Sequence, residues 1–369
     1  MFNMENVCKT NINVSSKKRI EWIDTAKAIL IFLIVFSHTI RNGYLEVFFL
    51  SFAIPCFFVL SGITYTRKTI KDDIISRFKR LLVPYFVFGL ISVIFYSFAG
   101  SKMADSLSIK TADYNFFHNI FGLIYGNWKT GYMNWNTPLY YFPLCFIVGI
   151  SVNIFENIVY KNNRSNVIRI LFITICLIIG YIFRIYNDSI CLPFFIESSF
   201  IYMSIFEISI ICKKYVLKEY KMIIQLTLSA ILFIICYRIS LDNYPYGNHN
   251  YILGKNYFVF VINALLLSTA IILLAKTIKS NYVSSLIGRN TVGILCMHKY
   301  PVLFLTAIIP FAKQSILSFP DDNITRNVVA FFISLVSIFL CLLFIYVIML
   351  QYPALLGEKN KRNIFKVKD

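Results

Sequence analysis

Residues 19–43 read RIEWIDTAKAILIFLIVFSHTIRNG, and this stretch decides the fold class. Between residues 26 and 40 it is apolar except for Lys27, His38 and two small hydroxyl residues. An α-helix needs about 20 such residues to cross a hydrocarbon layer roughly 30 Å thick. The stretch lacks the polar–apolar alternation of a barrel strand, which is the other structure that satisfies its backbone in lipid. It therefore predicts a first transmembrane helix.

The rest of the chain repeats this pattern. Of its 369 residues, 58% are hydrophobic and only 15% are charged, whereas soluble domains carry roughly 45–50% apolar and about 25% charged residues. The apolar residues gather in long blocks, which predict an all-α integral membrane protein with about ten transmembrane helices. The expected spans are 26–43, 46–65, 81–99, 138–158, 168–186, 192–212, 222–241, 257–275, 286–309 and 327–350.

The net charge is +18, from 36 Lys and Arg against 18 Asp and Glu. In a soluble protein this surplus would suggest nucleic acid, but here the basic residues lie in short runs between apolar blocks, and we expect no nucleic-acid partner. With the N-terminus inside, 25 basic residues fall on the inner side and 10 on the outer side. The positive-inside rule then predicts that both termini are cytoplasmic. The many Ile, Phe, Asn and Lys residues fit an AT-rich bacterial genome. We expect the bacterial cytoplasmic membrane.

The domain organisation is simple. We expect a cytoplasmic tail over 1–18 without a cleavable signal, one polytopic domain over 19–350, and a basic cytoplasmic tail over 351–369. The outer loops 100–137 and 242–256 are rich in Tyr, Asn, Trp and Gly. Such loops suit a sugar acceptor site, but equally an interfacial aromatic belt. The nine Cys are scattered, which indicates small buried hydrophobes and no metal site.

Ionisable residues within a span are candidates for function, because their burial in lipid is costly. Lys27 and His38 are 11 residues apart, close to three helical turns, so they share one face about 16 Å apart along the axis. Asp24 lies three residues before Lys27 and joins the same stripe. The alternative is that Asp24 and Lys27 lie at the interface and His38 makes one buried hydrogen bond.

Two further segments carry candidate residues. Arg77 and Arg80 share a helix face at the entry of the third span, where their planar guanidinium groups suit a phosphate or pyrophosphate; the alternative is ordinary positive-inside charge. The ninth span opens with LIGRNTVGILCMHKY over 286–300, in which Arg289 and Asn290 lie at the inner end and His298 two turns further out. Thr291 and His298 are seven residues apart, so we expect them to share a helix face.

These segments together resemble the membrane acyltransferase-3 family, and more narrowly its branch of fucose 4-O-acetyltransferase-like proteins. The resemblance runs from about residue 19 to 310 in one order, through RIEWIDTAKAILIFLIVFSHTI, FAIPCFFVLSGITY, RFKRLLVPYF, NTPLYYFPLCF and IGRNTVGILCMH. The chain departs from the family pattern at Ala53, where a His is frequent, at Tyr140–Tyr141, where Trp-Phe is usual, and at Glu207, where a small residue is usual. The matching residues are Asp24, Lys27, His38, Phe57, Phe58, Ser61, Gly62, Arg77, Arg80, Pro84, Tyr85, Arg289, Asn290 and His298.

The resemblance implies a membrane-bound O-acyltransferase that moves acetyl from cytoplasmic acetyl-CoA to a hydroxyl of a cell-surface or lipid-linked sugar. His38 would act as a general base on the acceptor hydroxyl or as an acyl carrier, with Lys27 and Asp24 beside it. Substrate or cofactor binding would fall to Arg77, Arg80, Ser61, Arg289, Asn290 and His298, without a metal. The alternatives are a transporter or flippase of lipid-linked sugars, although no paired broken helices are evident, and a glycan polymerase.

Overall fold

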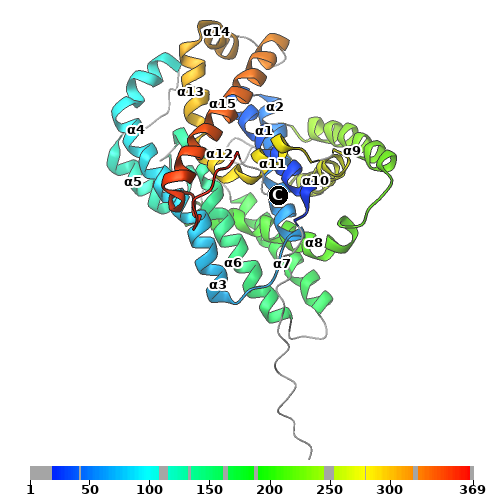
Figure 1. The fold of residues 1–369 in the computed structure, drawn as a ribbon. Coiled ribbons are helices and arrows are strands. Elements are labelled where there is room, and N and C mark those ends of the chain that lie inside the picture. The colour runs from blue at the N-terminus through cyan, green and yellow to red at the C-terminus, as the bar shows by residue number, and fades with distance from the viewer. Residues whose placement is uncertain are drawn as a thin grey trace, which may run out of the picture.

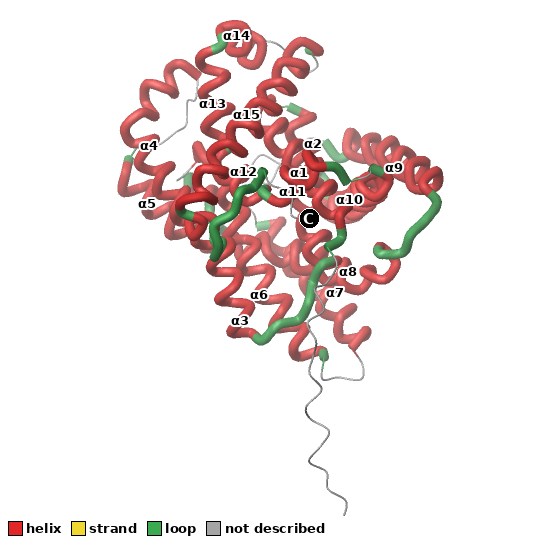
Figure 2. The backbone as a smooth tube through the Cα atoms, viewed as in Figure 1, coloured by secondary structure: helices red, strands yellow, loops and turns green. Residues whose placement is uncertain are grey.

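A computed structural model of the protein describes residues 19–40, 43–107, 115–131, 134–160, 165–186, 190–244, 253–278, 280–318 and 323–365. Figure 2 shows helices joined by loops, without a strand in these ranges. Nine of the described helices are long and apolar enough to cross a membrane, and one bent pair makes a tenth candidate. The prediction of an all-α membrane protein with about ten spans is confirmed. The predicted tail 1–18 and parts of both outer loops lie outside the described residues.

The helices follow the predicted blocks closely (Figure 1). The long ones are α1 (Glu21–Ile40), α2 (Tyr44–Ile63), α4 (Val83–Leu107), α6 (Tyr141–Val159), α7 (Ser165–Ile185), α8 (Ile196–Val216), α9 (Met222–Asp242), α10 (Tyr257–Thr277) and α15 (Ile324–Gln351). The shorter ones are α3 (Ile70–Arg77), α5 (Phe116–Tyr125), α11 (Tyr282–Arg289), α12 (Thr291–Met297), α13 (Lys299–Ile308) and α14 (Pro310–Ser318).

Helices α1 and α2 form the centre of the bundle. In their apolar windows 67% and 72% of residues are buried, against 11% for α7 and 17% for α9. Helix α1 packs on α2, α10, α11 and α15, and α2 also packs on α8 and α10. A helix enclosed in this way can carry polar side chains that lipid would disfavour, so Lys27 and His38 are tolerated in α1.

The helix that contains the third span begins before the predicted span. Helix α3, which is polar, leads through a π-helical turn over Phe78–Leu82 directly into the apolar α4. In the π turn, the Val83 N–H donates to the Phe78 carbonyl. Pro84 has no N–H to donate to the carbonyl of Arg80, four residues earlier, which favours an irregular turn at this point. Because π turns often lie at functional sites, the position of Arg80 in this turn is notable.

The predicted ninth span over 286–309 is present as a bent pair of helices, α12 and α13, preceded by the short α11. The segment breaks at Asn290, between α11 and α12, and bends by 47° at His298, between α12 and α13. The Asn290 amide donates to the Leu286 carbonyl at 2.7 Å, which satisfies a group left free at the end of α11. Pro301 lacks the N–H that a continuous helix would use, so it is tolerated only in the first turn of α13.

Two regions predicted as loop or tail are partly structured. The outer segment 100–137 contains the end of α4, the amphipathic α5, and short 3₁₀ turns at Trp128–Thr130 and Asn134–Tyr140. The segment after α15 forms a 3₁₀ turn at Pro353–Leu356 and packs against the bundle. Gly357 adopts a positive φ of 72° there, and a side chain at this position would collide with the carbonyl of Lys79.

Candidate active site

A cavity of about 250 Å³ lies among α1, α2, α6, α12 and the π turn. Five of the residues predicted from the sequence line it, although they come from three separate segments. These are Lys27 and His38 of α1, Ser61 of α2, Arg77 at the end of α3, and Arg80 in the π turn. The cavity therefore brings together most of the predicted site.

One face of α1 forms a wall of this cavity. Its lining residues are Lys27, Ile31, Ile34 and His38, whose spacing of four, three and four residues is that of a single helix face. Neither Lys27 nor His38 makes a hydrogen bond or ion pair with another described residue. The cavity is thus bounded by an ammonium group at one end and an imidazole about 16 Å further along the helix.

The two arginines stand in different surroundings. Arg77 is half-buried, and its Nε lies 2.7 Å from Oδ2 of Asp73, one turn earlier in α3. Its guanidinium lies against α6 at Gly149, where any side chain would collide with it. Arg80 is exposed and forms no ion pair with a described residue. Arg80 is therefore the more available cation for an anionic ligand.

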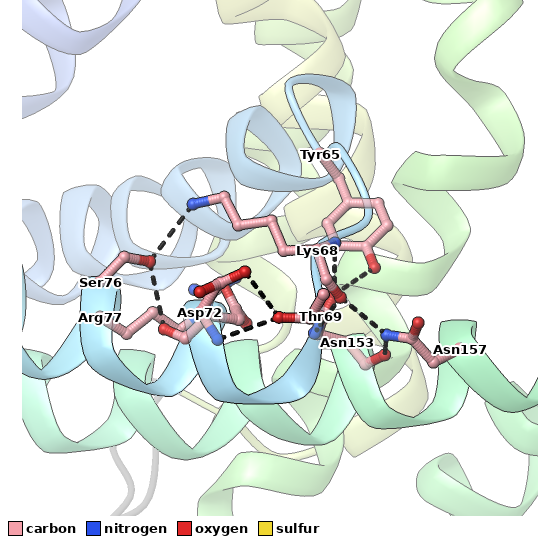
Figure 3. Close-up of polar contacts among 9 residues, drawn as sticks. Tyr65, Lys68, Thr69, Asp72, Ser76, Arg77, Asn153 and Asn157 are labelled. Carbon is pink, nitrogen blue, oxygen red and sulfur yellow. Dashed lines mark hydrogen bonds and ion pairs between the residues drawn. The ribbon is translucent and has the colours of Figure 1, made fainter. Parts of the chain in front are cut away.

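The segment before α3 is fastened to α6 (Figure 3). The Tyr65 hydroxyl donates to Asn153 Oδ1 at 2.7 Å, and the Lys68 carbonyl accepts from the amides of Asn153, at 3.2 Å, and Asn157, at 3.0 Å. Burial, followed by the neighbouring Glu156 carboxylate, raises the pKa of the Tyr65 phenol, so it remains a donor. These bonds fix the start of α3, and hence the direction in which Arg77 projects.

Helix α3 also begins with a side-chain cap. Thr69 Oγ1 accepts from the Asp72 N–H at 3.2 Å and donates to the Asp72 carboxylate at 2.7 Å. The Lys68 ammonium donates to Ser76 Oγ at 3.2 Å, as Figure 3 shows. An N-cap of this kind satisfies a backbone donor that would otherwise be free. It stabilises the short helix that carries Arg77.

Asp24 lies outside the cavity lining. Its carboxylate accepts two hydrogen bonds from Arg19, at 2.7 and 2.8 Å, and lies 3.5 Å from Nε of Arg289. The backbone of Asp24 also contacts Gly288 so closely that a side chain there would collide with it. Asp24 and Arg289 therefore join α1 to α11. The next residue, Asn290, is the point at which the helix breaks between α11 and α12.

His298 is fully buried at the bend between α12 and α13. Its ring stacks on that of His38, with centroids 5.4 Å apart and an interplanar angle of 27°. Its Nδ1 lies 3.1 Å from the Ile294 carbonyl and 3.0 Å from that of Leu295. Because both neighbours are acceptors, Nδ1 carries the proton in neutral His298, and Nε2 is left as an acceptor without a described partner. The two histidines thus meet, although His298 does not line the cavity.

Several residues of the lining had no role in the site predicted from the sequence, although some of them belong to the quoted motifs. Phe57, Phe58, Tyr140 and Tyr141 supply aromatic surface, and Thr137 approaches from the 3₁₀ segment after the outer loop. The paired aromatics in two of the quoted motifs were a usable signal. Thr137 was not foreseeable, because the non-helical backbone at Asn136, directly before it, has no clear sequence mark.

Glu207, noted as an unusual residue for its span, is fully buried in α8. Its carboxylate lies 3.5 Å from Nε of Arg169, whose Nη2 also binds Glu156 at 2.7 Å. The cluster joins α6, α7 and α8 next to the site and outside the cavity lining. Its role in the bundle is therefore to bind three helices together through one shared cation.

Among the residues that the structure describes, no group of three or more His, Cys, Asp or Glu is placed to hold a metal ion. The described cysteines are free thiols, five buried and three partly buried.

Comparison with known families gives one match. A family model described as an acyltransferase domain, that of the acyltransferase-3 family, matches residues 20–346, which is most of the chain. No curated protein and no solved structure gives a significant match.

Proposed function

Because the chain belongs to the acyltransferase-3 family, it is a membrane acyltransferase, and we propose that it moves an acetyl group from cytoplasmic acetyl-CoA to a hydroxyl of a cell-surface or lipid-linked sugar. The family match spans nearly all of the membrane bundle, and it assigns acyl transfer rather than sugar transport or polymerisation. Placement in the fucose 4-O-acetyltransferase-like branch is a narrower part of the proposal and rests on the quoted motifs. The bacterial cytoplasmic membrane and the cytoplasmic termini belong to the same proposal.

One observation carries the assignment of donor. A single cavity is bordered by three basic side chains at one end, those of Lys27, Arg77 and Arg80, and by His38 deeper in the bundle. In acetyl-CoA the phosphates lie far from the thioester, and the long, narrow pantetheine arm connects the two. Cations at the predicted cytoplasmic end suit the phosphates, and the apolar wall between Lys27 and His38 suits the arm.

The reaction needs a group that accepts a proton from the acceptor hydroxyl and returns it to the leaving thiolate. As a general base, His38 removes the proton from the acceptor hydroxyl, whose oxygen attacks the thioester carbonyl. The C–S bond then breaks, and the CoA thiolate takes the proton from His38, so that an ester and CoA-SH result. In the other version, the His38 imidazole attacks the thioester carbonyl, the C–S bond breaks and CoA leaves as the thiolate. The acceptor hydroxyl then attacks acetyl-His38 and its proton passes to the thiolate, so that the ester, free His38 and CoA-SH result.

His298 is a positioning residue in either version. Its ring stacks on His38, and its tautomer is held by the two backbone carbonyls at Nδ1. A stacked neighbour restricts the rotation of the His38 imidazole within the cavity. We propose a more remote role for Asp24 and Arg289, which hold α11 on α1 and so keep the Asn290 break next to the site.

The acceptor would enter from the opposite end, beside the aromatic lining. Tyr140, Tyr141 and Phe57 offer flat apolar faces, against which a sugar ring can pack. Thr137 and Ser61 are hydroxyl residues of the same cavity, and Ser61 Oγ already donates to the Phe57 carbonyl at 2.8 Å. Thr137 is thus the better candidate for contact with a sugar hydroxyl.

The direct test is acetyl transfer in membranes that contain the protein. Acetyl-labelled acetyl-CoA should label the glycan fraction, and mild alkali should release the label as acetate because the product is an ester. Membranes with equal amounts of His38→Ala protein are the matched control and should stay at background. Transfer from another acyl-CoA, with none from acetyl-CoA, would overturn the choice of donor while leaving the family assignment intact.

A further inference from the structure

A second cavity lies away from the proposed active site. It has a volume of about 480 Å³ and is enclosed by α2, α8, α9 and α10. Its lining residues on α2, Val59 and Ile63, point away from the first cavity, which is lined by Phe57, Phe58 and Ser61 of the same helix. Between the two, α2 meets α8 at Gly62, where a side chain would collide with Phe206 and Ser209. The second cavity is therefore a separate compartment.

The walls of this cavity are apolar along its length. Thr269 and Ser209 line it, but their hydroxyls donate to carbonyls of their own helices, at 2.9 and 2.7 Å. From Leu265 to Lys276 along α10, the lining extends over 11 residues, or about 16 Å. Helix α9 packs principally on α10 and lies at the edge of the molecule (Figure 1), so the compartment borders the lipid. Such a space suits a hydrocarbon chain.

One end of the cavity is basic and aromatic. The segment 213–221, from the last turn of α8 to the residue before α9, contains four lysines and one acidic residue, Glu219. Lys214 lies over the ring of Tyr215 at 4.8 Å, and Lys218 over that of Tyr220 at 5.7 Å, and both tyrosines line the cavity. This is the predicted cytoplasmic end, where tyrosines and lysines meet lipid headgroups.

Two buried polar groups lie at the same end. The Lys276 ammonium donates to the carbonyls of Val216 and Lys218, at 2.6 and 2.9 Å, and lies 3.9 Å from the Glu219 carboxylate. Gln225 is buried in the first turn of α9, and its Oε1 has no described donor. A buried acceptor without a partner is costly. A headgroup hydroxyl could supply the missing donor.

We propose that this cavity binds an anionic phospholipid of the cytoplasmic leaflet, with an acyl chain between α8 and α9 and its phosphate at Lys214 and Lys218. The apolar walls suit the acyl chain, and the excess of lysine suits the negative charge of the headgroup. Gln225 Oε1 could accept a hydrogen bond from a glycerol hydroxyl such as that of phosphatidylglycerol. Clefts between helices with a basic cytoplasmic rim bind anionic lipids in the same way. The proposal is independent of acyl transfer, since none of these residues lines the first cavity.

The test is a titration of the purified full-length protein in detergent with phosphatidylglycerol or phosphatidylcholine, read by native mass spectrometry. Phosphatidylglycerol should saturate one site, and phosphatidylcholine should not compete. Lys214→Gln with Lys218→Gln should weaken the affinity about 30-fold, because each lysine near an anionic headgroup contributes about fivefold. The matched control is the double variant Lys359→Gln with Lys361→Gln, at two exposed lysines beyond α15. It should change the affinity for phosphatidylglycerol less than twofold.

The chain position is tested by filling the cavity. Thr269→Phe on α10 and, separately, Ile224→Trp on α9 should each reduce phosphatidylglycerol binding at least tenfold; both start from exposed side chains, so folding should survive. The proposed role of Lys214 and Lys218 would be overturned if the protein bound both lipids equally. It would also be overturned if the control double variant lost as much affinity for phosphatidylglycerol as the variant at Lys214 and Lys218. Unchanged binding in both cavity-filling proteins would overturn the location.

Discussion

Arg80 offers the sharpest test of the donor site. Its side chain is exposed, lines the cavity and forms no ion pair with a described residue. Arg80→Ala therefore removes a contact to the donor without leaving another group of the protein unpaired. A hydrogen bond to a charged group contributes about 1.5–3 kcal/mol, so the affinity for acetyl-CoA should fall about ten- to hundredfold.

Arg77 provides the contrast within the same cavity. Its guanidinium is bound to Asp73, whose side chain is only 5% exposed. Arg77→Ala would leave that buried carboxylate without its partner, which is destabilising in addition to any loss of donor contact. We expect the melting temperature to fall in Arg77→Ala and to remain near the wild-type value in Arg80→Ala.

The measurement is the initial rate of transfer as a function of acetyl-CoA concentration. For Arg80→Ala, KM should rise and kcat should change little, because a contact remote from the thioester contributes equally to ground and transition states. Acetyl-pantetheine, a donor without the nucleotide, should be used equally well by the variant and the wild type. An equal loss with both donors would refute the assignment of Arg80 to the nucleotide end.

The remaining predictions concern α1 and the topology. His38→Ala should abolish acetylation with normal membrane levels, whereas Ser37→Ala, which removes only a hydrogen bond to the carbonyl three residues earlier, should keep most activity; full glycan acetylation by His38→Ala would refute the reaction centre. Lys27→Ala should impair activity strongly and Lys27→Arg less so, if charge is the requirement; equal rates in the two variants would show that it is not. Reporters near residue 216 and after residue 369 should report cytoplasm and one near 115 the exterior, and a cytoplasmic signal at 115 would contradict the orientation.

The sequence predicted those features of the candidate site that involve residues of a single helix. The spacing of Lys27 and His38 depends only on helix geometry, so their common face was predictable and is confirmed by the lining of the cavity. The same reasoning placed Asp24 on that stripe, but the structure pairs it with Arg19 and Arg289 instead. Arg19 is only five residues from Asp24, but spacing could not reveal the contact with Arg289, because that contact depends on how α11 packs on α1.

Length, hydropathy and charge by themselves determined that the chain is a helical membrane protein and which blocks cross the bilayer. These properties are sums over neighbouring residues. They suffice to identify a span because each transmembrane helix satisfies its own backbone hydrogen bonds within one continuous apolar segment. Tertiary structure alone decided that α1, α2 and the π turn meet at one cavity, that His298 stacks on His38, and that a second compartment lies beside α9. Such contacts depend on packing between helices that are far apart in the chain, and in lipid no hydrophobic pattern marks which helices associate.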